Sequence, residues 1–201
     1  MRNVGIMGGT FDPVHNGHIQ VAKCAKEQYH LNEIWFMPSK IPPHKRTQKI
    51  SSEKDRMQMV CLAIDGIPGF VASDFELHRS EITYTAHTMR LLKEKYPNTA
   101  FSFIMGGDSF FQFENWFHPE EIVKYTKILA TGRDGVSKEA MLQRKRELTK
   151  KFHGEFELID MEDFIVSSSS IREMIKNGEA VDSLLPAKVA DYIKLHNLYT
   201  E

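Results

Sequence analysis

Cysteine is scarce in this chain, and its scarcity excludes two kinds of site. The 201 residues include two cysteines, Cys24 and Cys61, which form no CxxC pair. A disulfide framework and a thiolate metal site both need more, or more closely spaced, cysteines. The cysteine content suits a reducing compartment and predicts a cytoplasmic location.

An excess of charge of either sign is also missing. Lys and Arg total 26 against 27 Asp and Glu, for a formal net charge of -1. There is therefore no global electrostatic attraction to nucleic acid or to an anionic membrane. A bound anion would have to be held by a local cluster of cations.

Long hydrophobic runs are absent as well. No apolar run approaches the length of a membrane span. The chain enters a strand-like segment at residues 4–7 without the charged-then-apolar start of a signal peptide. These absences predict neither a membrane nor a nucleic-acid partner. They leave the oligomeric state open, and a homo-oligomer is compatible with them.

What the sequence does contain is the alternation of an α/β protein. Hydrophobic residues make up 41% of the chain, which is ample for one core, so residues 1–201 are expected to form a single domain. Short apolar runs alternate with amphipathic stretches, which predicts a doubly wound, mostly parallel sheet. Strands are expected at 4–7, 34–37, 70–72, 101–105, 128–130 and 156–159, and helices at about 17–29, 52–64 and 85–96.

The last part of the chain has a different pattern. From Ile171 onward the sequence looks helical throughout, and Pro186 suits the first turn of a final helix. We therefore expect a core of about residues 1–165 and a small C-terminal helical part of about 166–201. The basic stretch 138–151 could bind nucleic acid, but its interleaved apolar residues favour an ordinary amphipathic helix with a solvated face.

The segment after the first strand carries the strongest functional signal. It contains Gly8 and Gly9, and then two histidines, His15 and His18, at the start of a helix. Glycines permit close approach of a ligand, and a helix start offers N–H groups and a positive dipole end to phosphate. A metal pair or incidental polar residues are the alternatives, but no third ligand has an obvious zinc-site spacing. The loop matches neither the dinucleotide fingerprint nor the P-loop.

Three further clusters are open to more than one interpretation. The serines at 167–170 followed by Arg172 suit a flexible loop or helix cap, and equally a second anion cradle. The loop 37–46 is charged, but its prolines stiffen it at the expected ligand-binding edge of the sheet. Trp116 is either a core residue or a ring that stacks on a ligand.

His15-Asn16-Gly17-His18 resembles the (H/T)-x-G-H signature of the nucleotidyltransferase superfamily, and the longer GGTFDPVHNGH string is typical of its nicotinate mononucleotide adenylyltransferases. The resemblance extends over nearly the whole chain and implies a Rossmann-like fold. It implies catalytic roles for His15, His18 and Arg172. The expected ATP-binding residues are Gly8, Gly9, Thr10, Phe11, His15, His18, Gly106, Asp108, Arg133, Ser168, Ser169 and Arg172. The expected mononucleotide-binding residues are His44, Lys45, Thr85, Trp116 and Phe117.

The resemblance also implies the reaction. Nicotinate mononucleotide would attack the α-phosphorus of ATP, with Mg²⁺ accompanying ATP and no metal site built from protein carboxylates. Nicotinamide mononucleotide, phosphopantetheine and a non-catalytic nucleotide-binding role are the alternatives. The sequence departs from the family pattern at Val166, at Ser169, and at Glu81, where a glycine is usual, so the loop before Tyr84 is open to a different conformation.

Overall fold

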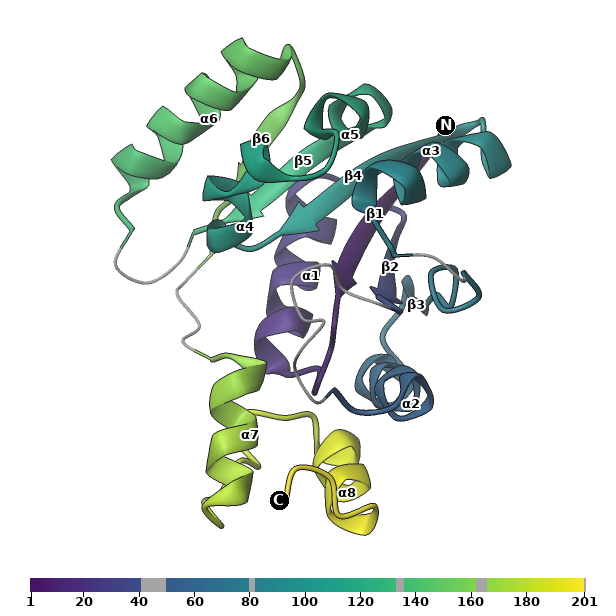
Figure 1. Ribbon diagram of the computed structural model, residues 1–201, viewed down its shortest axis with the longest axis vertical. Helices are drawn as coiled ribbons and strands as arrows, with labels where there is room; N and C mark the ends of the chain where they lie inside the picture. Colours follow the sequence, from purple (N-terminus) through teal and green to yellow (C-terminus); the bar gives the residue numbers. More distant parts are fainter. Residues whose placement is uncertain (41–49, 80–81, 133–135, 162–165, 201) are drawn as a thin grey trace.

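The computed structural model describes residues 1–40, 50–79, 82–132, 136–161 and 166–200, and within them six parallel strands form one sheet (Figure 1). Their order across the sheet is β3-β2-β1-β4-β5-β6. The strands are β1 (Arg2–Gly9), β2 (Glu33–Pro38), β3 (Phe70–Ala72), β4 (Thr99–Met105), β5 (Thr126–Thr131) and β6 (Phe156–Ile159). Each strand expected from the sequence is confirmed, and the doubly wound parallel arrangement with it.

Helices cover both faces of this sheet. The helices are α1 (Asn16–Gln28), α2 (Glu53–Ile64), α3 (Thr85–Lys95), α4 (Gly107–Phe111), α5 (Pro119–Tyr125), α6 (Lys138–Phe152), α7 (Ser168–Lys176) and α8 (Ala187–Leu195), with a 3₁₀ turn, η2, at Phe113–Asn115. Helices α1, α2, α7 and α8 contribute to one buried cluster, and α3, α5 and α6 to another. The three helices expected at 17–29, 52–64 and 85–96 are therefore confirmed to within one or two residues.

The central strands are apolar on both sides because both faces are covered. In β2, Ile34 and Phe36 belong to the cluster under α1 and α2, whereas Trp35 and Met37 belong to the opposite cluster. Successive side chains of a strand point to opposite faces, so a doubly covered strand becomes a continuous apolar run. This is the reason that short apolar runs, without alternation, were the correct signal for strands here.

The basic stretch forms α6, as the amphipathic interpretation predicted. Met141 and Leu148 are buried against the sheet. Flanking these apolar residues, Arg144 contacts Glu114 at 2.9 Å and Lys145 contacts Glu157 at 2.7 Å. Arg146 and Lys150 are exposed, which matches the solvated-face interpretation.

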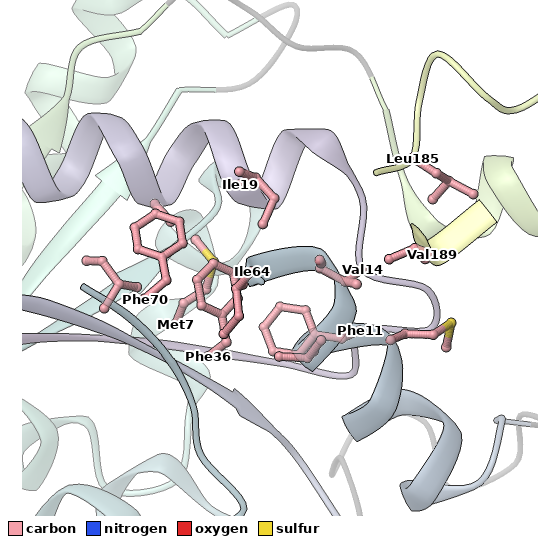
Figure 2. Close-up of a cluster of buried hydrophobic side chains, with 14 of the residues drawn as sticks. Met7, Phe11, Val14, Ile19, Phe36, Ile64, Phe70, Leu185 and Val189 are labelled. Carbon is pink, nitrogen blue, oxygen red and sulfur yellow. The ribbon is translucent and has the colours of Figure 1, made fainter. Parts of the chain in front are cut away.

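The C-terminal helices pack on the same core as the first loop of the chain. Leu185 and Val189 lie beside Val14, which follows β1 (Figure 2). The backbone N–H of Asn16 donates to the carbonyl of Leu184 at 2.9 Å, so the start of α1 is tied to the segment before α8. Pro186 stands at the N-cap of α8, one position before the first turn expected from the sequence.

Two glycines in the α2–β3 connection allow a test of how closely this connection packs against the chain between α1 and β2. Gly66 and Gly69 have φ of +77° and +78°, but a Cβ on Gly66 would meet open space, whereas one on Gly69 would lie 2.9 Å from the carbonyl oxygen of Asn32. We expect Gly66→Ala to lower the free energy of unfolding by about 1 kcal/mol, the cost of left-handed backbone. Gly69→Ala should cost about 2–4 kcal/mol, because the clash adds to it. Urea unfolding of both variants measures this, and equal costs would contradict the packing described.

Candidate active site

The order of the strands reverses between β1 and β4, and the candidate site lies where these strands end. The chain leaves β1 for α1 and β2 on one side, and β4 for α4 and β5 on the other. In sheets wound this way, ligands bind outside the carboxyl ends of the strands at this reversal. β1 ends at Gly9 and β4 at Met105, so residues 10–15 and 106–108 border the expected ligand.

The glycines at the end of β1 make room for aromatic rings. A Cβ on Gly8 would lie 3.3 Å from the ring of Phe103, and one on Gly9 would lie 3.2 Å from the ring of Phe11. Phe11 is 2% exposed, has a φ of +52°, and packs edge-on against the imidazole of His18 at 5.1 Å. Because Gly9 has no side chain, the ring of Phe11 can lie close to the end of β1. From there Phe11 packs against His18.

His15 and His18 lie face to face at the start of α1, with ring centroids 3.8 Å apart. His15 is the N-cap residue, and its backbone N–H donates to Nδ1 of His18 at 3.2 Å. Because Nδ1 accepts this bond, the neutral His18 ring carries its proton on Nε2. The backbone thus selects the tautomer in which Nε2 is a hydrogen-bond donor.

Burial keeps the first of these histidines neutral. His15 is 6% exposed, and its removal from water lowers the pKa of its imidazole to about 4. Within the described part of the chain, its Nδ1 is buried without a hydrogen-bond partner. A buried polar atom of this kind costs stability unless a ligand or water satisfies it. The pair therefore offers hydrogen bonds near neutral pH without requiring a charge on His15.

The start of α7 is docked against the same loop. The hydroxyl of Ser168 donates to the carbonyl of Pro13 at 2.9 Å, and Nη1 of Arg172 donates to the carbonyl of Asp12 at 2.7 Å. The N-terminal ends of α1 and α7 consequently lie side by side (Figure 1). Two helix N-termini directed at one loop provide N–H groups and dipole ends suited to anions.

The serine run before α7 acts as a helix cap. The hydroxyl of Ser167 accepts from the backbone N–H of Ser170 at 3.0 Å, and the Ser170 hydroxyl accepts in return from the N–H of Ser167 at 3.1 Å. The capping interpretation of this run is confirmed. Nη2 of Arg172 lies 3.4 Å from the hydroxyl of Ser169, so the cation and the serines are adjacent. Phosphate binding by Ser168, Ser169 and Arg172 stays a prediction.

Three residues that the sequence did not single out hold this loop in place. Arg56, 1% exposed, donates from Nη1 to the carbonyls of Thr10 and Ser39 at 2.9 and 2.8 Å. Asp12, 2% exposed, accepts from the hydroxyl of Tyr199 at 2.6 Å. A signal for Arg56 was present, since it lies on the same helical face as the apolar residues Met59 and Val60. Asp12 and Tyr199 are 187 residues apart, and no local pattern connects them.

Aromatic side chains are grouped near the start of α3. The rings of Tyr84 and Phe117 are stacked with centroids 4.3 Å apart, and Phe117 is 41% exposed. Trp116 is half-buried and packs on Phe103, with centroids 6.0 Å apart. Thr85 begins α3 directly after Tyr84. The Tyr84–Phe117 contact thus brings the start of α3 next to the segment that carries Trp116. Binding of the mononucleotide by Thr85, Trp116 and Phe117 stays a prediction.

The buried carboxyl group of Glu76 is hydrogen-bonded to α3 through Thr88. Glu76 is 8% exposed and accepts from the hydroxyl of Thr88 at 2.6 Å, while Arg79 donates to the same hydroxyl at 3.0 Å. Burial raises the pKa of Glu76 to about 7, against the opposing effects of Thr88, Arg79 and Thr83. This network connects the segment after β3 to α3, whose first residue is Thr85.

The remaining predicted residues are of two kinds. Asp108 is exposed at the start of α4, beside a groove of about 670 Å³ lined by Asp108, Phe111, Gln112, Val136, Ser137 and Ala140. A Cβ on Gly106 would meet open space, so the backbone there is accessible. His44, Lys45, Arg133 and Glu81 lie outside the described residues.

Two absences concern the described residues only. Those ranges hold no group of three or more His, Cys, Asp or Glu side chains arranged to bind a metal ion. They also contain no helix long and apolar enough to cross a membrane.

The fold and the loop after β1 define a class of nucleotidyltransferase. Residues 6–174 match the family model described as cytidylyltransferase-like. The probable nicotinate-nucleotide adenylyltransferase of Lachnoclostridium phytofermentans is 45% identical over 99% of this chain and 100% of its own length. That of Carboxydothermus hydrogenoformans is 39% identical over 98% of this chain and 97% of its own length.

Solved structures share the fold at lower identity. The nicotinic acid mononucleotide adenylyltransferase of Plasmodium falciparum, complexed with NaAD, superimposes with a TM-score of 0.80 at 22% identity, covering 99% of this chain and 98% of that one. A putative nicotinate-nucleotide adenylyltransferase of Vibrio parahaemolyticus gives 0.71 at 19% identity, covering 100% and 97%. The chain belongs to the nicotinate-nucleotide adenylyltransferases of the cytidylyltransferase-like family.

The raised pKa of Glu76 predicts a specific pH dependence of stability. The folded chain holds this proton up to about pH 7, whereas a free Glu loses it near pH 4.5. The folded state therefore binds more protons between these values, and stability falls as pH rises through that window. Relative to Glu76→Gln, the wild-type free energy of unfolding should fall by on the order of 3 kcal/mol between pH 4.5 and pH 7.5.

Urea unfolding at several pH values measures this difference. Glu94→Gln is the control, because Glu94 is an exposed glutamate on α3, the helix to which Glu76 is hydrogen-bonded. That variant should track the wild type across the range. If the difference in free energy of unfolding between wild type and Glu76→Gln does not change with pH, the pKa of Glu76 is not raised in the folded chain.

Proposed function

We propose that this chain transfers the adenylyl group of ATP to nicotinate mononucleotide, forming deamido-NAD and releasing pyrophosphate. The observation that carries the proposal is the pair of helix starts around residues 10–15. There, His18 presents a donor on Nε2, and Arg172 and the serines of α7 stand beside it. Such a site is suited to several phosphate groups at once.

The chemistry needs no nucleophile from the protein. A phosphate monoester has a second pKa of about 6, so the attacking oxygen of the mononucleotide is already anionic near neutral pH. Attack at the α-phosphorus of ATP forms the new P–O bond as the bond to pyrophosphate breaks. Catalysis then consists of holding the two phosphates in line and stabilising the charge on the transferring group.

His15 and His18 supply hydrogen bonds to the α-phosphate region. His15 remains neutral, because burial lowers the pKa of its imidazole to about 4, so it acts through a hydrogen bond and not as a charged acid. His18 donates from Nε2, since its Nδ1 is held by the backbone of His15. A preorganised donor of this kind costs no reorganisation when charge develops.

The rest of the ATP is held by the strand ends and by α7. Arg172 and the backbone at Ser168 and Ser169 contact the β- and γ-phosphates, with Arg133 as a further contact. Gly8, Gly9, Thr10 and Phe11 shape the loop beneath the phosphates, and Gly106 and Asp108 contact the ribose. We assign no protein residue to hold Mg²⁺; bound to ATP, it would screen the charge of the phosphates.

The acceptor occupies the side bordered by aromatic rings. Trp116 stacks on the pyridinium ring, whose positive charge is attracted to the face of an indole. Backbone N–H groups at Thr85 and Phe117 bind the nicotinate carboxylate. His44 and Lys45 contact the phosphate of the mononucleotide.

We propose one domain, with a core of about residues 1–165 and a helical part of about 166–201 that shares its apolar cluster through Leu185 and Val189. We place it in the cytoplasm, since Cys24 and Cys61 are free thiols suited to a reducing compartment.

The direct test is pyrophosphate release with ATP and magnesium, comparing nicotinate mononucleotide with nicotinamide mononucleotide. We expect the acid to be strongly preferred, because backbone N–H groups donate to a carboxylate and would oppose the amide NH₂. Preference for the amide would overturn the substrate and keep the reaction. Absence of turnover with both, and with phosphopantetheine, would indicate a non-catalytic nucleotide-binding role.

A substitution of His18 tests the transition-state role. We expect His18→Ala to lower kcat by roughly 10²–10³-fold while changing KM for ATP much less, as removal of a preorganised oxyanion donor does. Steady-state kinetics measures both constants. His196→Ala, on the exposed end of α8, is the matched control and should behave as wild type. Equal losses in kcat and in ATP affinity would count against a transition-state role for His18.

A further inference from the structure

Tyr199 is remote in sequence from the residues of the site, but its hydroxyl reaches the centre of the phosphate-binding loop. It donates to Oδ1 of Asp12 at 2.6 Å. The other oxygen of Asp12 accepts from the backbone N–H of Ser51 at 3.3 Å. Burial, together with the nearby charge of Asp12, raises the pKa of the Tyr199 hydroxyl, so it remains a donor at any physiological pH.

Asp12 is the point at which several contacts of the loop meet. Its backbone carbonyl accepts from Arg172 at 2.7 Å, and its side chain stands near the buried cation of Arg56. Only 2% of Asp12 is exposed, so water does not solvate its carboxylate. A buried carboxylate needs hydrogen-bond donors, and it takes them from whichever donors are within reach.

Two cations are therefore close to one buried anion. Arg56 already donates from Nη1 to Thr10 and Ser39, and from Nε to Ser51 at 3.2 Å, so its position is fixed by three carbonyls. Among the described residues, Arg172 has one short contact, to the Asp12 carbonyl, and a longer one to Ser169 at 3.4 Å. Of the two, Arg172 is the cation less constrained by this part of the chain.

We propose that the hydroxyl of Tyr199 is a positioning group for ATP: it satisfies the Asp12 carboxylate with a neutral donor and so leaves the Arg172 guanidinium for the phosphates. Without that hydroxyl, the carboxylate draws Arg172 onto its side chain and away from the ligand. This inference rests on the proposed function, because it assigns Arg172 to the triphosphate. It adds a residue beyond α8 to those that determine ATP binding.

Tyr199→Phe is the direct variant, since it keeps the ring and removes the donor. The matched control is Tyr192→Phe on α8, which removes another tyrosine–aspartate hydrogen bond, from Tyr192 to Asp55 at 2.8 Å. Asp55 lies in the first turn of α2 and accepts from the hydroxyl of the N-cap residue Ser52. Within the described residues it has no contact with Arg172, so this control reports only the structural cost of losing a tyrosine–aspartate hydrogen bond.

We expect Tyr199→Phe to lower kcat/KM for ATP by about tenfold, with KM for nicotinate mononucleotide within twofold of wild type. Tyr192→Phe should leave both near the wild-type values. The temperature midpoints of unfolding of the two variants should be similar. The proposal would be overturned if the two variants had the same kcat/KM for ATP. It would also be overturned if Tyr199→Phe impaired the use of nicotinate mononucleotide as much as that of ATP.

A second variant tests the charge argument. In an Asp12→Asn background the side chain is neutral and does not attract Arg172, so adding Tyr199→Phe should change kcat/KM for ATP less than twofold. A full tenfold loss in that background would overturn the mechanism. If the wild-type enzyme did not transfer the adenylyl group at all, the proposed function would be refuted instead. The failure of this inference and the failure of the proposed function can therefore be distinguished.

Discussion

The burial of Arg56 is the constraint on which the candidate site depends. A guanidinium removed from water must be compensated by acceptors and by negative charge, or the fold loses several kcal/mol. The carbonyls of Thr10, Ser39 and Ser51 supply the acceptors, and Asp12 supplies the charge. Satisfying one cation therefore fixes the loop after β1, the end of β2 and the start of α2 relative to each other. This requirement therefore fixes the shape of the loop at residues 10–15.

Helix ends contribute positive potential at the candidate site without adding net charge to the chain. The formal net charge is -1, and burial keeps His15 neutral. Among the described residues, α1 and α7 meet at their N-termini, with Arg172 at the contact. Helix dipoles and oriented N–H groups favour anions without attracting them to the rest of the surface. This attraction for anions is therefore local to the start of the two helices.

Much of the fold and part of the site could be predicted because their signals are local. The six strands were visible as short apolar runs, and the loop from Gly8 to His18 as a contiguous motif. The capping role of Ser167 was one of two open interpretations, and only the backbone geometry decided it. The contacts of Arg56, Asp12, Glu76 and Tyr199 could not be foreseen in the same way. Their partners are brought together by the winding of the sheet. The apolar helical face on which Arg56 lies indicates that it is buried, but it does not reveal which carbonyls accept its hydrogen bonds.

The two edge strands of the sheet are very short, and this limits strand pairing between copies of the chain. Its edges are β3, with three residues, and β6, with four. An edge strand exposes unpaired backbone groups that can template pairing with another chain, and brevity is one of the ways in which proteins suppress this. Here the longest strands, β1 and β4, are at the centre, where both sides are already paired. The molecule thereby keeps the strand ends needed for chemistry while offering little backbone from which an aggregate could grow.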